Sequence, residues 1–230
     1  MRFHKSIPSC TWIAAGLAGL ASSAVPRVSR AGGEGYCGAY AEAANTEQES
    51  NLHYQCGNSG ASWSTNRKAH HDWCIAALQE SVEQQAVYRL RRLRACSLDA
   101  LCSTYAQIAA HEDRIREGMR CPLSGPRWIS DPRAHYEWCL HAPQDGIERE
   151  ALARMSDLQS CQRCADYANR AVAQNINYNI PWRCGGGAPR WSSDFNQHFR
   201  WCWDAKDESL RSEESSRRED LKSCRGRFPP

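Results

Sequence analysis

The sequence predicts an all-α protein made of three tandem disulfide-stapled helical units that follow a signal peptide. Three observations lead to this prediction. Twelve of the thirteen cysteines recur at regular intervals. The stretches between them are rich in Ala, Glu, Gln and Arg, which are good helix formers. The alternating Val/Ile/Thr runs and Asn-Gly turns that indicate strands and hairpins do not occur in the sequence.

Residues 1–24 have the layout of a secretory signal peptide. Arg2 and Lys5 precede an uncharged stretch from Thr11 to Val25, and the small residues 21–24 offer a cleavage site. The apolar stretch is shorter than the roughly 20 residues that a membrane span needs. An uncleaved N-terminal anchor is the alternative. We therefore expect a periplasmic or secreted protein with no stable membrane insertion after cleavage.

The cysteines define the predicted units. Cleavage would remove Cys10 and leave twelve cysteines, an even number as expected for full pairing in an oxidising compartment. The gaps between them run 19, 18, 22, then 19, 18, 22, then 20, 18, 22. A repeat of this kind predicts a linear array of similar units. The predicted segments are a linker at 25–36, unit 1 at 37–96, unit 2 at 102–161, unit 3 at 164–224 and a tail at 225–230.

Other residues recur at fixed offsets from the cysteines. In each unit, Tyr-Ala follows the first cysteine, Trp follows the second, His-x-x-Trp-Cys ends at the third, and an Arg precedes the fourth. The pattern C-x2-Y-A … C-x3-G-x-R-W … H-x2-W-C resembles an uncharacterised cysteine-rich tandem-repeat family of secreted proteobacterial proteins. The resemblance covers essentially the whole mature chain, and it implies no activity because none is established for that family. The chain departs from the pattern at Ala61-Ser62 and at Ala188.

Each unit is expected to hold three helices. The first runs from about the first cysteine to a few residues before the second, and a loop rich in Gly or Pro follows. A short second helix carries the His-x-x-Trp-Cys block, and Asp131-Pro132 looks like its start in unit 2. The third helix ends at the fourth cysteine, and in unit 1 an apolar stripe marks it at Val82, Ala86, Leu90 and Leu93. The short links between units predict that neighbouring units touch.

Four cysteines per unit allow three pairings. Antiparallel packing of the first and third helices would bring the first cysteine to the fourth and the second to the third. On that assumption the predicted disulfides are Cys37–Cys96, Cys56–Cys74, Cys102–Cys161, Cys121–Cys139, Cys164–Cys224 and Cys184–Cys202. Each bond would stabilise a unit whose own core is thin.

The irregular loop after the second cysteine is the candidate ligand-binding region, because Arg and Trp are enriched at binding hot spots. The candidate residues are Arg127, Trp128, Arg190, Trp191, His135 and His198. Each has a structural alternative: core packing for the tryptophans and a hydrogen bond for the histidines. A structural role is also the alternative to ligand binding for the recurring arginines Arg89, Arg154 and Arg217. Each could form a stabilising ion pair, and one possible partner is an acid on the first helix.

Several function classes have no support in the sequence. Cysteine gaps of 18 to 22 lack the close pairs of structural zinc sites, so we expect no metal and no cofactor. Cys161 and Cys164 form a C-x-x-C that resembles a redox motif, but the junction of two units explains it. Without Arg2 and Lys5 the mature chain has 27 basic and 26 acidic residues, which gives no case for nucleic acid. No catalytic motif stands out.

Three hypotheses follow. The leading one is a secreted or periplasmic non-enzymatic binding module whose ligand is an envelope glycan or a protein, since triplication suits multivalent binding. The second is a disulfide-stabilised structural or inhibitory protein. The third is a hydrolase with His135 or His198 as general base, which would require one unit to differ chemically from the others.

Overall fold

The computed structural model describes residues 33–179 and 189–225. Every regular element in these two ranges is a helix, which confirms the all-α prediction. The predicted signal peptide and most of the linker and tail lie outside these ranges. Among the described residues, no helix is both long enough and apolar enough to span a membrane.

Units 1 and 2 each contain a long, a short and a long helix, as predicted. Unit 1 holds α1 (Glu34–His53), α2 (Arg67–Ala76) and α3 (Gln79–Cys96). Unit 2 holds α4 (Leu98–Gly118), α5 (Pro132–His141) and the first half of α6 (Gln144–Gln174).

Unit 3 begins inside α6, because the chain does not break between units 2 and 3. The link at 162–163 is helical, and α6 continues for 31 residues in all. A π-helical turn, η1 (Asn175–Asn179), follows directly. The remaining elements of unit 3 are η2 (Pro189–Trp191), α8 (Phe195–Asp204) and α9 (Asp207–Arg225).

The short helix of unit 2 starts where the sequence predicts, and the other two short helices start in the same way. An Asn or Asp side chain caps each of them by accepting a hydrogen bond from a backbone amide in the first turn. Asn66 caps α2 at 3.0 Å, Asp131 caps α5 at 2.9 Å and Asp194 caps α8 at 2.8 Å. Pro132 occupies the first turn of α5, where its missing amide hydrogen costs nothing.

The predicted disulfide pairing is wrong. In the described residues the first cysteine of a unit bonds to the third, and the second bonds to the fourth. The bonds are Cys37–Cys74, Cys56–Cys96, Cys102–Cys139, Cys121–Cys161 and Cys164–Cys202. These exclude all six predicted pairs: Cys37–Cys96, Cys56–Cys74, Cys102–Cys161, Cys121–Cys139, Cys164–Cys224 and Cys184–Cys202. The side chains of Cys184 and Cys224 lie outside the described part of the chain.

The direction of the third helix explains the error. The loop and α2 bring the chain back to the start of α1, where Cys37 and Cys74 have Cα atoms 5.5 Å apart. From there α3 runs parallel to α1 and ends beside Cys56, with the Cα atoms of Cys56 and Cys96 5.3 Å apart. The prediction assumed antiparallel helices and overlooked this return. Each of the five bonds joins two cysteines of the same unit, and none links two different units among the described residues. Five disulfides fit a chain that folds in an oxidising, non-cytosolic compartment.

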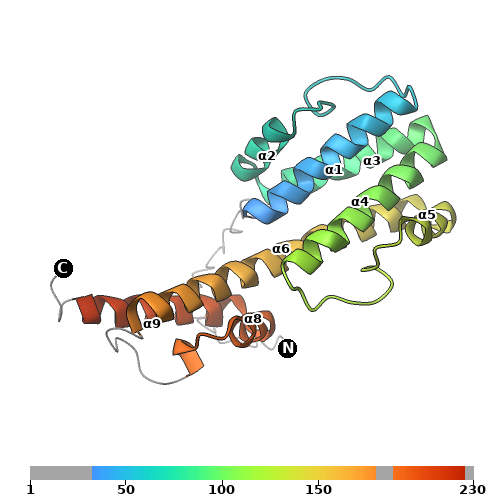
Figure 1. The fold of residues 1–230 in the computed structure, drawn as a ribbon. Coiled ribbons are helices and arrows are strands. Elements are labelled where there is room, and N and C mark those ends of the chain that lie inside the picture. The colour runs from blue at the N-terminus through green and yellow to red at the C-terminus, as the bar shows by residue number, and fades with distance from the viewer. Residues whose placement is uncertain (1–32, 180–188, 226–230) are drawn as a thin grey trace, which may run out of the picture.

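Units 1 and 2 pack against each other, whereas unit 3 extends away from them (Figure 1). Helix α1 contacts both α4 and α6 of unit 2. One apolar cluster joins Leu90 and Leu93 of α3 to Leu101 and Tyr105 of α4 and to Ile147 of α6. The C-terminal part of α6 extends away from this body and lies beside α9 (Figure 1).

Candidate ligand-binding grooves

A buried arginine lies at the centre of each unit. The three are Arg89, Arg154 and Arg217, and their exposed fractions are 0%, 1% and 2%. In units 1 and 2 the partner is a carboxylate on the first helix of the unit, since Arg89 pairs with Glu47 and the Nε of Arg154 lies 2.5 Å from Glu112. This confirms the alternative that the recurring arginines form ion pairs with the first helix in these two units. In unit 3 the partner is the amide Gln174, at 2.8 Å.

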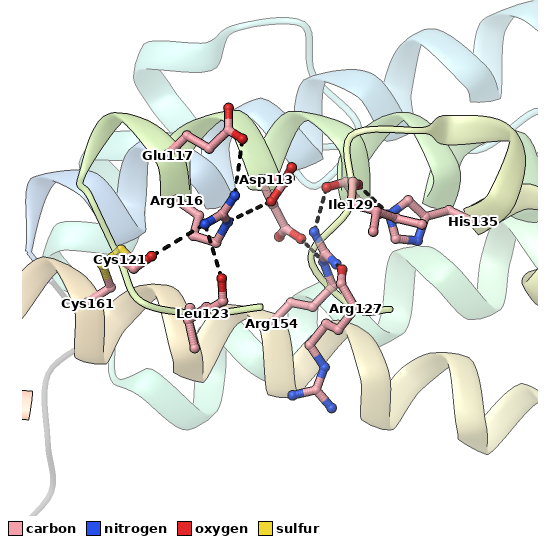
Figure 2. Close-up of polar contacts among 12 residues, drawn as sticks. Asp113, Arg116, Glu117, Cys121, Leu123, Arg127, Ile129, His135, Arg154 and Cys161 are labelled. Atoms are coloured by element: carbon pink, nitrogen blue, oxygen red, sulfur yellow. Dashed lines mark hydrogen bonds and ion pairs between the residues drawn. A yellow bond between two sulfur atoms is a disulfide. The ribbon is translucent and has the colours of Figure 1, made fainter. Parts of the chain in front are cut away.

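The buried arginine also positions the loop after the second cysteine. Arg154 donates hydrogen bonds to the backbone carbonyl of Arg127 and, at 2.5 Å, to that of Ala109. Its guanidinium lies 4.4 Å from the ring centre of Trp128. Figure 2 shows Arg154 beside the loop that carries Arg127. Arg217 makes the equivalent contacts in unit 3, to the carbonyl of Arg190 and the ring of Trp191.

The recurring histidines hold the same loop. In each unit the His Nε2 lies within hydrogen-bond distance of a loop carbonyl. The pairs are His70 with Ser64 at 2.9 Å, His135 with Ile129 at 2.9 Å (Figure 2) and His198 with Ser192 at 3.0 Å. Burial lowers the pKa of all three rings below the usual value for histidine. A neutral ring that donates through Nε2 therefore fits the structural alternative for His135 and His198.

The two tryptophans of each unit have different surroundings. Trp128 and Trp191, both predicted ligand contacts, are only 6% exposed and pack on the buried arginines. By contrast, the Trp of the His-x-x-Trp-Cys block is 42% exposed at Trp138 and 40% exposed at Trp201. These exposed rings pack against Tyr105 and Tyr167 at centroid distances of 5.4 Å and 5.3 Å. They are the aromatic surfaces available to a ligand.

The predicted contacts Arg127 and Arg190 are each held by two carboxylates. The Nε and Nη2 of Arg127 bond to Glu150 at 2.7 Å and 3.0 Å, and its Nη1 bonds to Asp157 at 3.0 Å. Arg190 contacts the equivalent two acids: its Nε bonds to both carboxylate oxygens of Glu213, at 2.9 Å and 3.0 Å, and its Nη1 bonds to Asp220 at 3.3 Å. Sequence reasoning missed these acids. Their signal was a matched spacing of 11 and 18 residues after the third cysteine in units 2 and 3.

These side chains line an open groove in each of units 2 and 3. The unit 2 groove has a volume of about 500 Å3 and the unit 3 groove about 630 Å3. Both are lined by residues at equivalent positions: Tyr105, Arg127, Trp128, His135, Trp138, Glu150 and Asp157 in one, and Tyr167, Arg190, Trp191, His198, Trp201, Glu213 and Asp220 in the other. One guanidinium between two carboxylates leaves each groove with one excess negative charge.

Unit 1 replaces all three charged residues of the groove. Ser62 stands at the position of Arg127 and donates a hydrogen bond to Gln85, at the position of Glu150, at 2.9 Å. Arg92 stands at the position of Asp157 and bonds to Asn58 at 2.8 Å. Unit 1 thus keeps the exposed Trp73 but has different charges beside it.

Comparison of the chain with protein-family models, curated proteins and solved structures finds no match. What the grooves can bind is therefore inferred from the residues that line them. Among the described residues, no group of three or more His, Cys, Asp or Glu side chains could hold a metal ion.

Proposed function

We propose that this chain is a secreted or periplasmic non-enzymatic protein of three tandem units, and that it binds an envelope glycan through the grooves of units 2 and 3. The observation that supports this proposal most is the recurrence of one groove in two units of the chain, with the same residue type at each of the seven equivalent positions named above. A resemblance to secreted cysteine-rich repeat proteins and the predicted signal peptide agree with it.

The groove chemistry suits a sugar. Trp138, whose ring packs on the buried Tyr105, presents aromatic surface on which the apolar face of a sugar ring can pack. Glu150 and Asp157 are already fixed by Arg127, so their remaining lone pairs point in set directions toward ligand hydroxyls. Ligand sites of this kind combine apolar walls with a few precisely oriented polar groups.

Two grooves on one helix suit a polymer of repeating sugars. Glu150 and Asp157 of the unit 2 groove and Tyr167 of the unit 3 groove all lie on α6. The continuous helix fixes the separation of the grooves, and we propose that both bind one polymer at the same time. Linked weak sites gain avidity in this way without any new contact.

The test is retention of the mature protein on insoluble peptidoglycan, with soluble glycan fragments as competitor. We expect the double variant Trp138→Ala/Trp201→Ala to lose about 10- to 100-fold in apparent affinity. Trp73→Ala is the matched control, because Trp73 has the same place and similar exposure in unit 1. Circular dichroism would check that each variant stays folded. Unchanged retention of the double variant would refute the proposal.

A second pair of substitutions tests the charged residues of the groove separately from its exposed tryptophan. Arg127→Ala with Arg190→Ala should also weaken retention, because Glu150 and Glu213 lose the partner that orients them. Retention that soluble glycan does not compete, together with a single captured protein, would favour the structural or inhibitory hypothesis instead.

A further inference from the structure

Unit 3 differs from the other two units at the partner of its buried arginine. Glu47 and Glu112 stand ten residues after the first cysteine of units 1 and 2, and Gln174 stands at that position in unit 3. A pocket of about 200 Å3 lies beside it, lined by Gln174 and Arg217 among others. We infer that this pocket binds a small oxyanion, a carboxylate or a phosphate group, which supplies the negative charge that unit 3 lacks.

Within the described ranges, the acceptors at hydrogen-bond distance from the guanidinium of Arg217 are all neutral. Its Nε donates to Gln174 at 2.8 Å, one Nη donates to the carbonyl of Ala171 at 2.8 Å, and the other donates to the carbonyl of Arg190. The nearest carboxylate, Glu213, is 3.9 Å from Nη1 and already holds Arg190 at 2.9 Å. A buried positive charge without a full counter-charge is unfavourable, and a bound anion would relieve it.

The two kinds of unit differ electrostatically at this arginine. Burial lowers the pKa of Arg217 below the usual value for arginine. For Arg89, burial acts in the same direction, but the ion pair with Glu47 and the contact with Tyr40 outweigh it, and the pKa is raised. The protein environment thus favours the charged form in unit 1 and disfavours it in unit 3. An anion bound near Arg217 would supply the negative charge that Glu47 supplies to Arg89.

The other walls of the pocket favour an anion. Arg170, Arg217 and Arg218 line it, against one carboxylate, Glu214. Glu214 pairs with Arg170 at 2.6 Å, and Arg218 has no ion pair among the described residues. The lining therefore carries two excess positive charges. Guanidinium groups match the planar geometry of carboxylates and the oxygens of phosphates.

Gln174 suits an anion site better than glutamate would. Its Oε1 accepts from Arg217, which leaves the NH2 of the same amide to donate to a bound oxyanion. A carboxylate at that position has no donor and would repel the anion. The substitution of amide for acid therefore changes an internal ion pair into a site that is completed from solution.

The test is thermal unfolding of the mature protein at constant ionic strength, with inorganic phosphate or acetate replacing chloride. We expect a saturable rise in Tm of about 5 to 10 °C at 100 times the Kd, because the anion binds only the folded state. A response to phosphate alone would identify a phosphate group as the ligand chemistry, and a response to acetate a carboxylate.

Two variants make the test decisive. Gln174→Glu restores the internal pair and should abolish the rise, while Arg218→Ala should reduce it through the loss of one lining charge. Trp138→Ala/Trp201→Ala should keep the full rise, so that the anion site is tested apart from the glycan grooves. No rise in the unsubstituted protein, or an equal rise in both pocket variants, would overturn the inference.

Discussion

Units 1 and 3 each lack a feature that the other has: unit 1 lacks the groove arginine, and unit 3 lacks the buried carboxylate. Unit 1 retains the buried pair of Arg89 with Glu47 but has Ser62 where the groove arginine would stand. Unit 3 retains the groove around Arg190 but has Gln174 where the buried carboxylate would stand. Unit 2 has both features. The buried centre and the surface groove are therefore separable, although the buried arginine holds the loop from which the groove is made.

Units 1 and 3 should differ most in the loss of stability that follows when the partner of the buried arginine is replaced by Ala. Glu47→Ala leaves Arg89 as an unpaired buried charge, and we expect the free energy of unfolding to fall by about 3–5 kcal/mol. Gln174→Ala removes only a neutral acceptor and should cost about 1–2 kcal/mol. Urea unfolding of both variants measures the two losses. Equal losses would show that the carboxylate and the amide play the same role.

Removal of one disulfide comes next. The bonds Cys37–Cys74 and Cys164–Cys202 span 37 and 38 residues. Loop entropy predicts a loss of about 4 kcal/mol for each when both cysteines are replaced by Ala. Urea unfolding under oxidising conditions compares the two double variants. A clearly greater loss in unit 1 would mean that this bond also maintains the packing of α1 on unit 2, beyond closing its own loop.

A third groove can be built into unit 1. The triple variant Ser62→Arg, Gln85→Glu, Arg92→Asp gives unit 1 the charged residues of unit 2, next to the exposed Trp73. If the grooves bind glycan as proposed, a third site should tighten retention on peptidoglycan by about tenfold. The single change Arg92→Asp is the control, since it alters net charge without adding the groove arginine. Identical retention of the triple and single variants would count against the groove assignment.

The smallest effect concerns pH. Burial lowers the pKa of His70, His135 and His198 in the folded state, so the unfolded chain binds protons more readily at these residues. Their contribution to stability is present above the unfolded pKa of about 6.5 and is lost as the pH falls below it. We expect His198→Gln to flatten the decline of stability between pH 7 and pH 5 slightly. Urea unfolding across that range, against the unsubstituted protein, measures the change in slope, and an unchanged slope would contradict it.

The sequence was most informative where chemistry is local. Helix-forming composition predicted the all-α class, and Asp131 with Pro132 marked a helix start, because caps act within one turn. The ion pair of Arg154 with the first helix was one of the alternatives that the sequence left open.

Features that depend on the path of the chain were not predictable in the same way. The disulfide pairing was wrong because cysteine spacing does not say whether α3 runs parallel or antiparallel to α1. Arg127 was predicted to face a ligand, and its two acids on α6 were overlooked, because they meet it only after the loop folds back. Spacing alone does not tell which of the two tryptophans in a unit is buried: Trp128 is 6% exposed, whereas Trp138 is 42% exposed.

The uninterrupted helix α6 has a consequence for how this protein can be divided. At 31 residues it is about 46 Å long, and the boundary between units 2 and 3 falls in its interior. Cys161 and Cys164, one turn apart, anchor it to Cys121 on one side and to Cys202 on the other. A protease that cuts between the units would have to unwind this doubly anchored turn first. Units 2 and 3 are therefore not detachable modules, and a gene truncated after unit 2 would encode a helix deprived of half its length and of its second anchor.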